Sequence, residues 1–137
     1  MGFFRRLVNM TKLKTYLNFA SLLACEVDSS TSPQFYKTLV KITVEKLFAS
    51  NGMLDNPLPP NYRDEAYAGF CMILREFAMD KAARGETAMF ESAKRHYLAL
   101  LHVASHRELK LCDQAIATAK VEALLLMNED ATKNGFF

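Results

Sequence analysis

The sequence predicts an all-α protein, a four- to five-helix bundle with short connections. Apolar residues recur at helical spacing in five separate segments, and glycine or proline stands between most of them. Half of the 137 residues are apolar and only 23% are charged, which is enough apolar side chain for one core. We therefore expect a single helical domain over residues 1–137, with a basic N-terminal segment at 1–10 and a stiff proline-containing linker at 55–60.

The first helix is expected at about residues 11–27, where one apolar stripe consists of Leu13, Tyr16, Leu17, Ala20, Leu23, Ala24 and Val27. The sequence DSSTSP then interrupts the helical spacing. Ser32 can cap a second helix with Pro33 at its first position, where the missing N–H costs nothing.

The second helix is expected to end at Phe48, because Asn51-Gly52 supplies the left-handed residue that closes a helix. Its apolar side includes Phe35, Leu39, Ile42 and Leu47. Residues 40–44 are rich in β-branched side chains, so a strand is the alternative for that run.

A third helix is expected after the sequence DNPLPPN, with Asn61 as its cap and Asp64 and Glu65 placed well against the helix dipole. Gly85 should end it, and a fourth helix should begin near Thr87.

The sequence SHRE at 105–108 has the form of a capping box, so the fourth helix either breaks there or continues. A fifth apolar stripe follows and consists of Leu109, Cys112, Ile116, Ala119, Ala123 and Leu126. These elements together make the expected bundle.

Positive charge is concentrated in the first part of the chain. Residues 1–50 contain seven Lys and Arg residues against three acidic residues, a net charge of +4, whereas the whole chain carries only +2. Nucleic-acid binding usually requires denser basic clusters than this. The pattern favours a modestly acidic protein partner, and nucleic acid is not expected.

The N-terminal 25 residues contain four basic and no acidic residues, which is typical of a mitochondrial targeting segment. The sequence LLAC at 22–25 also resembles a bacterial lipoprotein processing site. No apolar run approaches the roughly 18 residues of a membrane span.

Cys25, Cys71 and Cys112 form no C-x-x-C pair, so we expect three buried free thiols in a reducing compartment.

Two histidines have a spacing that could serve metal binding. His102 and His106 lie four positions apart, which places two imidazoles on one helix face, although ordinary surface or interface histidines are the alternative. His96 follows Lys94 and Arg95 and is expected on the same solvated face. Because no nucleophile–base pair and no glycine-rich phosphate loop can be assembled, an enzyme is not favoured.

Aromatic residues stand at both ends of the chain, in MGFFRR and NGFF. Phe3, Phe4, Phe136 and Phe137 either fold back on the bundle or anchor in neighbouring subunits, since buried aromatic side chains dominate interface energies. We expect them to bind partner proteins.

The pattern Phe48-x-x-Asn51-x5-Pro57, preceded by Tyr36, resembles the LYR-motif family of small mitochondrial proteins. Alignment on Leu22-Leu23 puts Asn18-Phe19-Ala20 at the Leu-Tyr-Arg positions. Phe19 then takes the aromatic position, and Ala20 stands where the family has an arginine that would meet phosphate or carboxylates.

The resemblance implies that the protein binds an acyl carrier protein, whose acyl-phosphopantetheine group belongs to that partner, so no intrinsic cofactor is expected. Phe19 and Phe48 would flank an apolar tunnel. The basic residues that would meet the acidic carrier are Lys12, Lys14, Lys37 and Lys41. Members of the family act as accessory subunits or assembly factors of respiratory complexes and iron–sulfur machinery.

The sequence therefore favours a non-catalytic accessory subunit or adaptor of a larger assembly, of the mitochondrial respiratory-chain type, with other protein subunits as partners. One alternative is a small soluble helical domain of bacterial or phage origin with a regulatory binding role, which would be cytoplasmic. The other alternative is a metal-dependent enzyme that uses His102 and His106.

Overall fold

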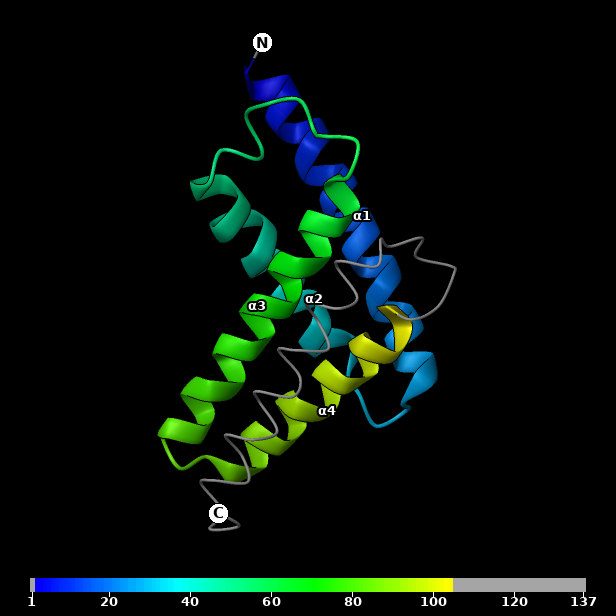
Figure 1. Cartoon of the computed structure of the whole chain (residues 1–137), viewed down its shortest axis with the longest axis vertical. Coiled ribbons are helices and arrows are strands. Elements are labelled where there is room, and N and C mark those ends of the chain that lie inside the picture. Colours follow the sequence, from blue (N-terminus) through cyan, green and yellow to red (C-terminus); the bar gives the residue numbers. More distant parts are fainter. Residues whose placement is uncertain (1, 105–137) are drawn as a thin grey trace.

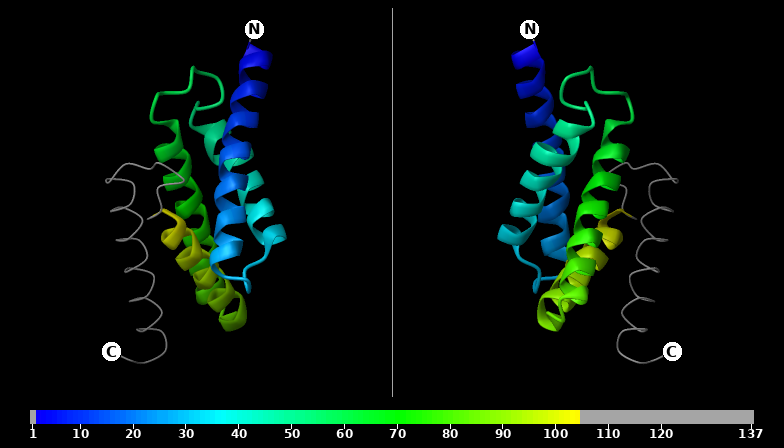
Figure 2. Two further views of the ribbon diagram at one scale, coloured as in Figure 1. Left: turned by 90° about the vertical axis from the view of Figure 1, so that its right-hand side faces the viewer. Right: turned by 90° about the vertical axis from the view of Figure 1, so that its left-hand side faces the viewer.

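The computed structural model describes residues 2–104, and these residues form a helical bundle (Figure 1). Its elements are α1 (Gly2–Val27), α2 (Pro33–Ile42), the π-helical turn η1 (Thr43–Phe48), α3 (Tyr62–Ala83) and α4 (Thr87–Ala104). In Figure 2, α1 and α2 form one antiparallel pair beside the pair formed by α3 and α4. The expected all-α class is confirmed for this part of the chain, and the run at 40–44 is helical rather than a strand.

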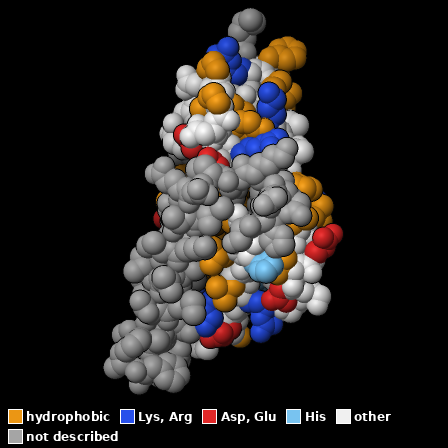
Figure 3. Space-filling view, turned by 45° about the vertical axis from the view of Figure 1, so that its right-hand side comes forward, with side chains coloured by type: hydrophobic (Ala, Val, Ile, Leu, Met, Phe, Trp, Pro, Cys, Tyr) orange, Lys and Arg blue, Asp and Glu red, His pale blue; other side chains and the backbone are white. Residues whose placement is uncertain are grey.

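Helix α1 begins at Gly2, so the expected start near residue 11 was wrong. The added turns are held by the loop that follows η1. The Asn9 side chain donates to the carbonyls of Leu54 and Asn56 at 3.1 and 2.8 Å, and Arg6 donates to both carboxylate oxygens of Asp55 at 2.8 and 3.0 Å. The outer side of these turns is hydrophobic and basic, as the upper end of the molecule in Figure 3 shows.

Helix α2 begins as the sequence predicts. Ser32 is its N-cap, and the Ser32 hydroxyl accepts a hydrogen bond from the Phe35 N–H at 3.3 Å. The helix continues through the π-helical turn to Phe48, and Gly52 then adopts the left-handed conformation with φ +84°. Asn51 supports that turn, because its side-chain oxygen accepts from the Met53 N–H.

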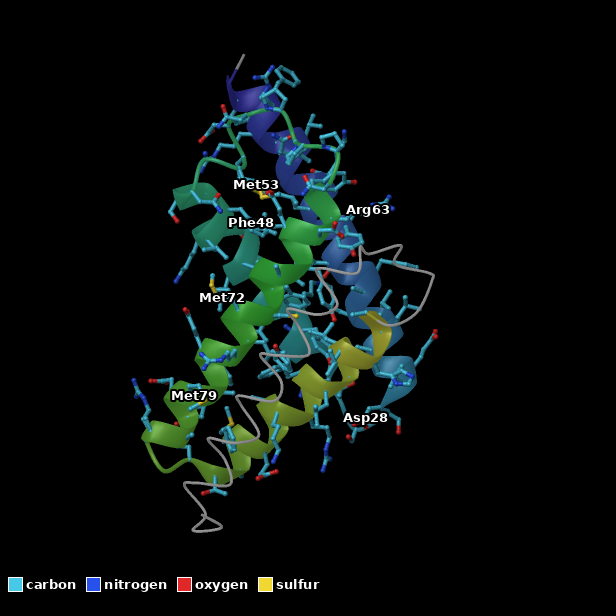
Figure 4. All side chains as sticks on the ribbon, viewed as in Figure 1. Asp28, Phe48, Met53, Arg63, Met72 and Met79 are labelled. Atoms are coloured by element: carbon cyan, nitrogen blue, oxygen red, sulfur yellow. The ribbon has the colours of Figure 1, made fainter. Side chains whose placement is uncertain are left out.

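Phe48 lies in the core between η1 and α3 with only 2% of its surface exposed (Figure 4). Gly69 of α3 makes room for the ring: a Cβ atom added there would lie 2.7 Å from Phe48 Cζ. The close approach of η1 to α3 thus depends on the missing side chain at this position.

Helices α3 and α4 also follow the predicted limits. Asn61 occupies the N-cap position of α3, but its side chain makes no capping hydrogen bond; the Asn61 carbonyl accepts from the Asp64 N–H instead. Gly85 ends this helix with φ +74°, and α4 begins at Thr87. The capping box at 105–108 and the fifth helix expected at 109–126 lie outside the described residues.

His96 is buried at 2% exposure, so its expected place on a solvated face was wrong. Its Nε2 accepts from the Ser32 N–H at 2.8 Å, and its Nδ1 lies 2.7 Å from the Ser92 carbonyl. Because Nε2 accepts, Nδ1 must carry the proton and donate to Ser92, so the ring is neutral. The rotation of α4 places Arg95 toward solvent, leaves Lys94 partly buried and turns His96 inward.

Two tyrosines reach α4 through the core. Tyr36 Oη donates to the His96 carbonyl at 2.7 Å, and Tyr67 Oη donates to the Leu100 carbonyl. Such buried bonds join α2 and α3 to α4 with defined geometry, which apolar contacts alone do not supply.

None of the described helices combines the length and the apolar character that crossing a membrane requires.

Substitution Gly69→Ala should lower the free energy of unfolding by about 1–2 kcal/mol. The overlap with Phe48 costs about 1–3 kcal/mol, and the better helix propensity of alanine returns up to about 1 kcal/mol. Urea denaturation measures the change. Gly2→Ala is the matched control, because no atom lies within 4 Å of its added Cβ. Equal stability of the two variants would contradict this packing.

The free energy of unfolding should fall as the pH drops from about 7 to about 5. Burial holds the pKa of His96 below its ordinary value of 6.5, so below that pH the unfolded chain binds the proton more readily. His96→Gln should be less stable at neutral pH but should lose most of this pH dependence. Urea midpoints measured across this range test both expectations, and an unchanged slope in His96→Gln would refute the assignment.

Candidate functional site

A groove of about 680 Å³ runs between α1 and α2, and we call it the basic groove. It is lined by Lys14, Asn18, Gln34, Lys37, Thr38, Val40, Lys41 and Glu45. Lys37 and Lys41 lie one turn apart on α2, and Lys14 faces them from α1. Three of the four lysines selected from the sequence therefore meet in one place.

The basic groove carries unpaired positive charge. Lys14 Nζ lies 3.1 Å from a carboxylate oxygen of Glu45, and about a third of each side chain is exposed. Lys37 and Lys41 are exposed and form no ion pair with a described residue. The groove thus presents two uncompensated ammonium groups beside one weakly held pair, an arrangement that attracts carboxylates.

A second groove, of about 540 Å³, lies on the other side of α1, against the start of α3. We call it the aromatic groove; it is lined by Thr11, Lys12, Thr15, Tyr16, Phe19, Tyr62 and Arg63. The Arg63 guanidinium lies over the Tyr16 and Tyr62 rings, 5.6 and 5.9 Å from their centroids. Lys12 and Lys14 face different grooves because two positions along a helix point in nearly opposite directions.

The Tyr16 hydroxyl in the wall of the aromatic groove is buried and has no hydrogen-bond partner among the described residues. Burial raises the pKa of this hydroxyl, and the nearby Arg63 charge opposes that shift. A buried hydroxyl without a partner costs about 1–3 kcal/mol of folding free energy. Tyr16 therefore differs from Tyr36 and Tyr67, whose hydroxyls are satisfied.

His102 is exposed in a third groove, of about 520 Å³, between the end of α1 and α4. This groove also contains Asp28 and Glu91. His106 lies outside the described residues. Within residues 2–104, no group of three or more His, Cys, Asp or Glu side chains is arranged to hold a metal ion.

The aromatic residues selected from the sequence are separated by the fold. Phe19 is 46% exposed in the aromatic groove, whereas Phe48 is inside the core and lines none of the three grooves. Phe3 and Phe4 are exposed at the start of α1. Phe136 and Phe137 lie outside the described residues.

Ala20 is fully buried. In the alignment on Leu22-Leu23, the family's arginine position therefore faces the core of this protein, where a guanidinium has no room.

The cysteines differ in burial: Cys71 is buried, Cys25 is partly exposed, and Cys112 is outside the described range.

Arg63 and Glu45 belong to the grooves but were missed from the sequence. Arg63 joins the aromatic groove only because the start of α3 returns to α1 across roughly 50 residues, and no local pattern reports that contact. Glu45 could have been suspected, because it lies four positions after Lys41, on the same helix side.

Comparisons of this chain with protein-family models, with curated proteins and with solved structures returned no match.

Tyr16→Phe should leave the free energy of unfolding unchanged or raise it by up to about 1 kcal/mol, because it removes a buried hydroxyl that has no partner. Tyr36→Phe is the matched control and should cost about 1 kcal/mol, since it removes the hydrogen bond to the His96 carbonyl. Chemical denaturation of both variants gives the comparison. A loss in Tyr16→Phe as large as that in Tyr36→Phe would show that the Tyr16 hydroxyl is bonded.

Proposed function

We propose that this protein is a non-catalytic helical adaptor that binds an acidic protein partner in the basic groove. The observation that supports this most is the meeting of Lys14, Lys37 and Lys41 in one groove, with a single carboxylate, Glu45, among them. The described side chains that line the groove include no nucleophile–base pair, and their lysines suit it to recognition of an acidic surface.

The partner's contact is a row of carboxylates on a helix or an extended segment. Lys37 and Lys41 lie about 6 Å apart along α2, a spacing that successive turns of an acidic helix reproduce. Carboxylates from the partner can also compete with Glu45 for Lys14, because a partly exposed ion pair contributes only about 0–1 kcal/mol. The groove thus becomes more positive when Glu45 is displaced.

An acyl carrier protein is the acidic partner that the LYR-type resemblance suggests, inside an assembly of the mitochondrial respiratory-chain type. In this proposal its acyl-phosphopantetheine group remains on the carrier, and Phe19 is the exposed aromatic side chain that α1 contributes to the aromatic groove. The buried position of Ala20 means that the lysines, rather than an arginine on α1, provide the positive charge.

Charge reversal on α2 tests the proposal. Lys41→Glu should weaken binding of purified, acylated carrier protein about tenfold or more, and Lys37→Glu/Lys41→Glu should weaken it further. Lys46→Glu is the matched control: it makes the same charge change at an exposed lysine of the same helical segment, outside the groove. Glu45→Gln should act in the opposite direction and strengthen binding. Isothermal titration at two salt concentrations measures these effects.

Native purification of each variant from the source organism, with mass spectrometry of what accompanies it, extends the test to an unknown acidic partner. An assembly that is lost with Lys41→Glu but kept with Lys46→Glu supports the adaptor function. Equal recovery with both variants, together with equal carrier affinity, would refute the role of the basic groove.

A further inference from the structure

The first turns of α1 expose a cluster of large apolar side chains, which we call the apolar tip: Phe3, Phe4, Leu7 and Val8. Their exposed fractions are 76%, 71%, 49% and 48%. Helical spacing puts all four on the outer side of α1, away from Asn9, which faces the bundle. Exposed apolar clusters of this kind usually mark an interaction surface.

The apolar tip is held in this orientation from its inner side. Asn9 and Arg6 bond the inner side of α1 to residues 54–56, with four hydrogen bonds of 2.8–3.1 Å. The inner side is thereby occupied, and within residues 2–104 the apolar tip keeps its outer surface open. It forms a convex projection at the end of a helix, rather than a concave site that would hold a small molecule (Figures 1 and 3).

The charged residues that α1 itself carries around the apolar tip are all positive. Residues 2–25 contain Arg5, Arg6, Lys12 and Lys14 and no acidic residue. Arg6 is paired with Asp55, while Arg5 and Lys12 are exposed and form no ion pair with a described residue. Phenylalanine and leucine on one helix face, bordered by lysine and arginine, are the composition of helices that lie at the surface of anionic membranes.

We propose that the apolar tip inserts into the interface of an anionic lipid bilayer, with Arg5 and Lys12 at the level of the lipid phosphates. The long aliphatic stems of these two residues follow the apolar surface while their charges remain in the headgroup region. A convex apolar end with a cationic border fits a deformable lipid surface better than a second protein, which would need a pocket for each phenylalanine. This anchor uses residues outside the basic groove and does not depend on the proposed function.

Co-sedimentation of the full chain with lipid vesicles tests the anchor. The protein should bind vesicles of phosphatidylcholine mixed with phosphatidylglycerol and should bind much less to phosphatidylcholine alone. Phe3→Ser/Phe4→Ser should lower the partition coefficient by at least about tenfold, because most of the inserted apolar surface is removed. Arg5→Gln/Lys12→Gln should lower binding to the anionic vesicles about 25-fold, since each cation near such a surface contributes about fivefold.

Leu22→Ser/Met89→Ser is the control, because it removes two exposed apolar side chains away from the tip. It should keep wild-type binding. The chain has no tryptophan, so Phe3→Trp gives an unmixed fluorescence signal that should shift to the blue with anionic vesicles, whereas Leu22→Trp should not shift.

Three results would overturn the proposal. The first is wild-type protein that binds neither kind of vesicle. The second is an equal loss in Phe3→Ser/Phe4→Ser and in the Leu22→Ser/Met89→Ser control. The third is a wild-type protein that is dimeric in analytical ultracentrifugation and does not bind vesicles, while Phe3→Ser/Phe4→Ser is monomeric. That result would make a second copy of the chain the occupant of the apolar tip. Circular dichroism of each variant confirms that the helices are retained.

Discussion

The hydrogen bonds around His96 determine where α2 lies, and the basic groove depends on that placement. The His96 ring accepts from the Ser32 N–H and donates to the Ser92 carbonyl of its own helix, and the His96 backbone carbonyl accepts from Tyr36 Oη, so the start of α2 is tied to α4 by two hydrogen bonds. Lys37 and Lys41 follow within two turns of Tyr36. A change at this node would therefore move the two lysines relative to Lys14, although none of them contacts the imidazole.

Most helix limits could be predicted because short-range chemistry sets them. Ser32, Gly52 and Gly85 each act through their own backbone or side chain, so a local pattern contains the whole cause. The start of α1 could not be predicted in this way. Its first turns carry apolar residues on the outer side, and they are held by residues 54–56, which lie more than 40 positions away in the chain. An apolar stripe at helical spacing indicates the side of a helix that packs against a core. The first turns of α1 pack little against the core, so no such stripe marks their inner side.

The sequence shows which charged residues are present in the candidate site but not how the helices bring them together. The basic first half of the chain and the LYR-type resemblance together selected Lys12, Lys14, Lys37 and Lys41. That three of them meet in one groove depends on the pairing of α1 with α2, which no charge count contains. His96 was misplaced because its neighbours in sequence are charged. Its burial follows from the rotation of α4 and from the bond that it accepts at the N-cap of α2. Polar residues that face a core are the ones that local composition assigns to the surface.

On helix α1, one face contributes to the stability of the fold and another face is available for recognition. Its inward residues, such as Leu13 and Leu17, are fully buried, while two ion pairs tie its cations Lys14 and Arg6 to the neighbouring segments. The remaining cations of α1, Arg5 and Lys12, are exposed and form no ion pair with a described residue. Because exposed pairs contribute only about 0–1 kcal/mol, an incoming anion can replace either carboxylate at small cost to the fold. The cations of α1 can therefore exchange their carboxylate partners within the chain for anions of a partner protein or of a bilayer, while the core beneath α1 stays unchanged.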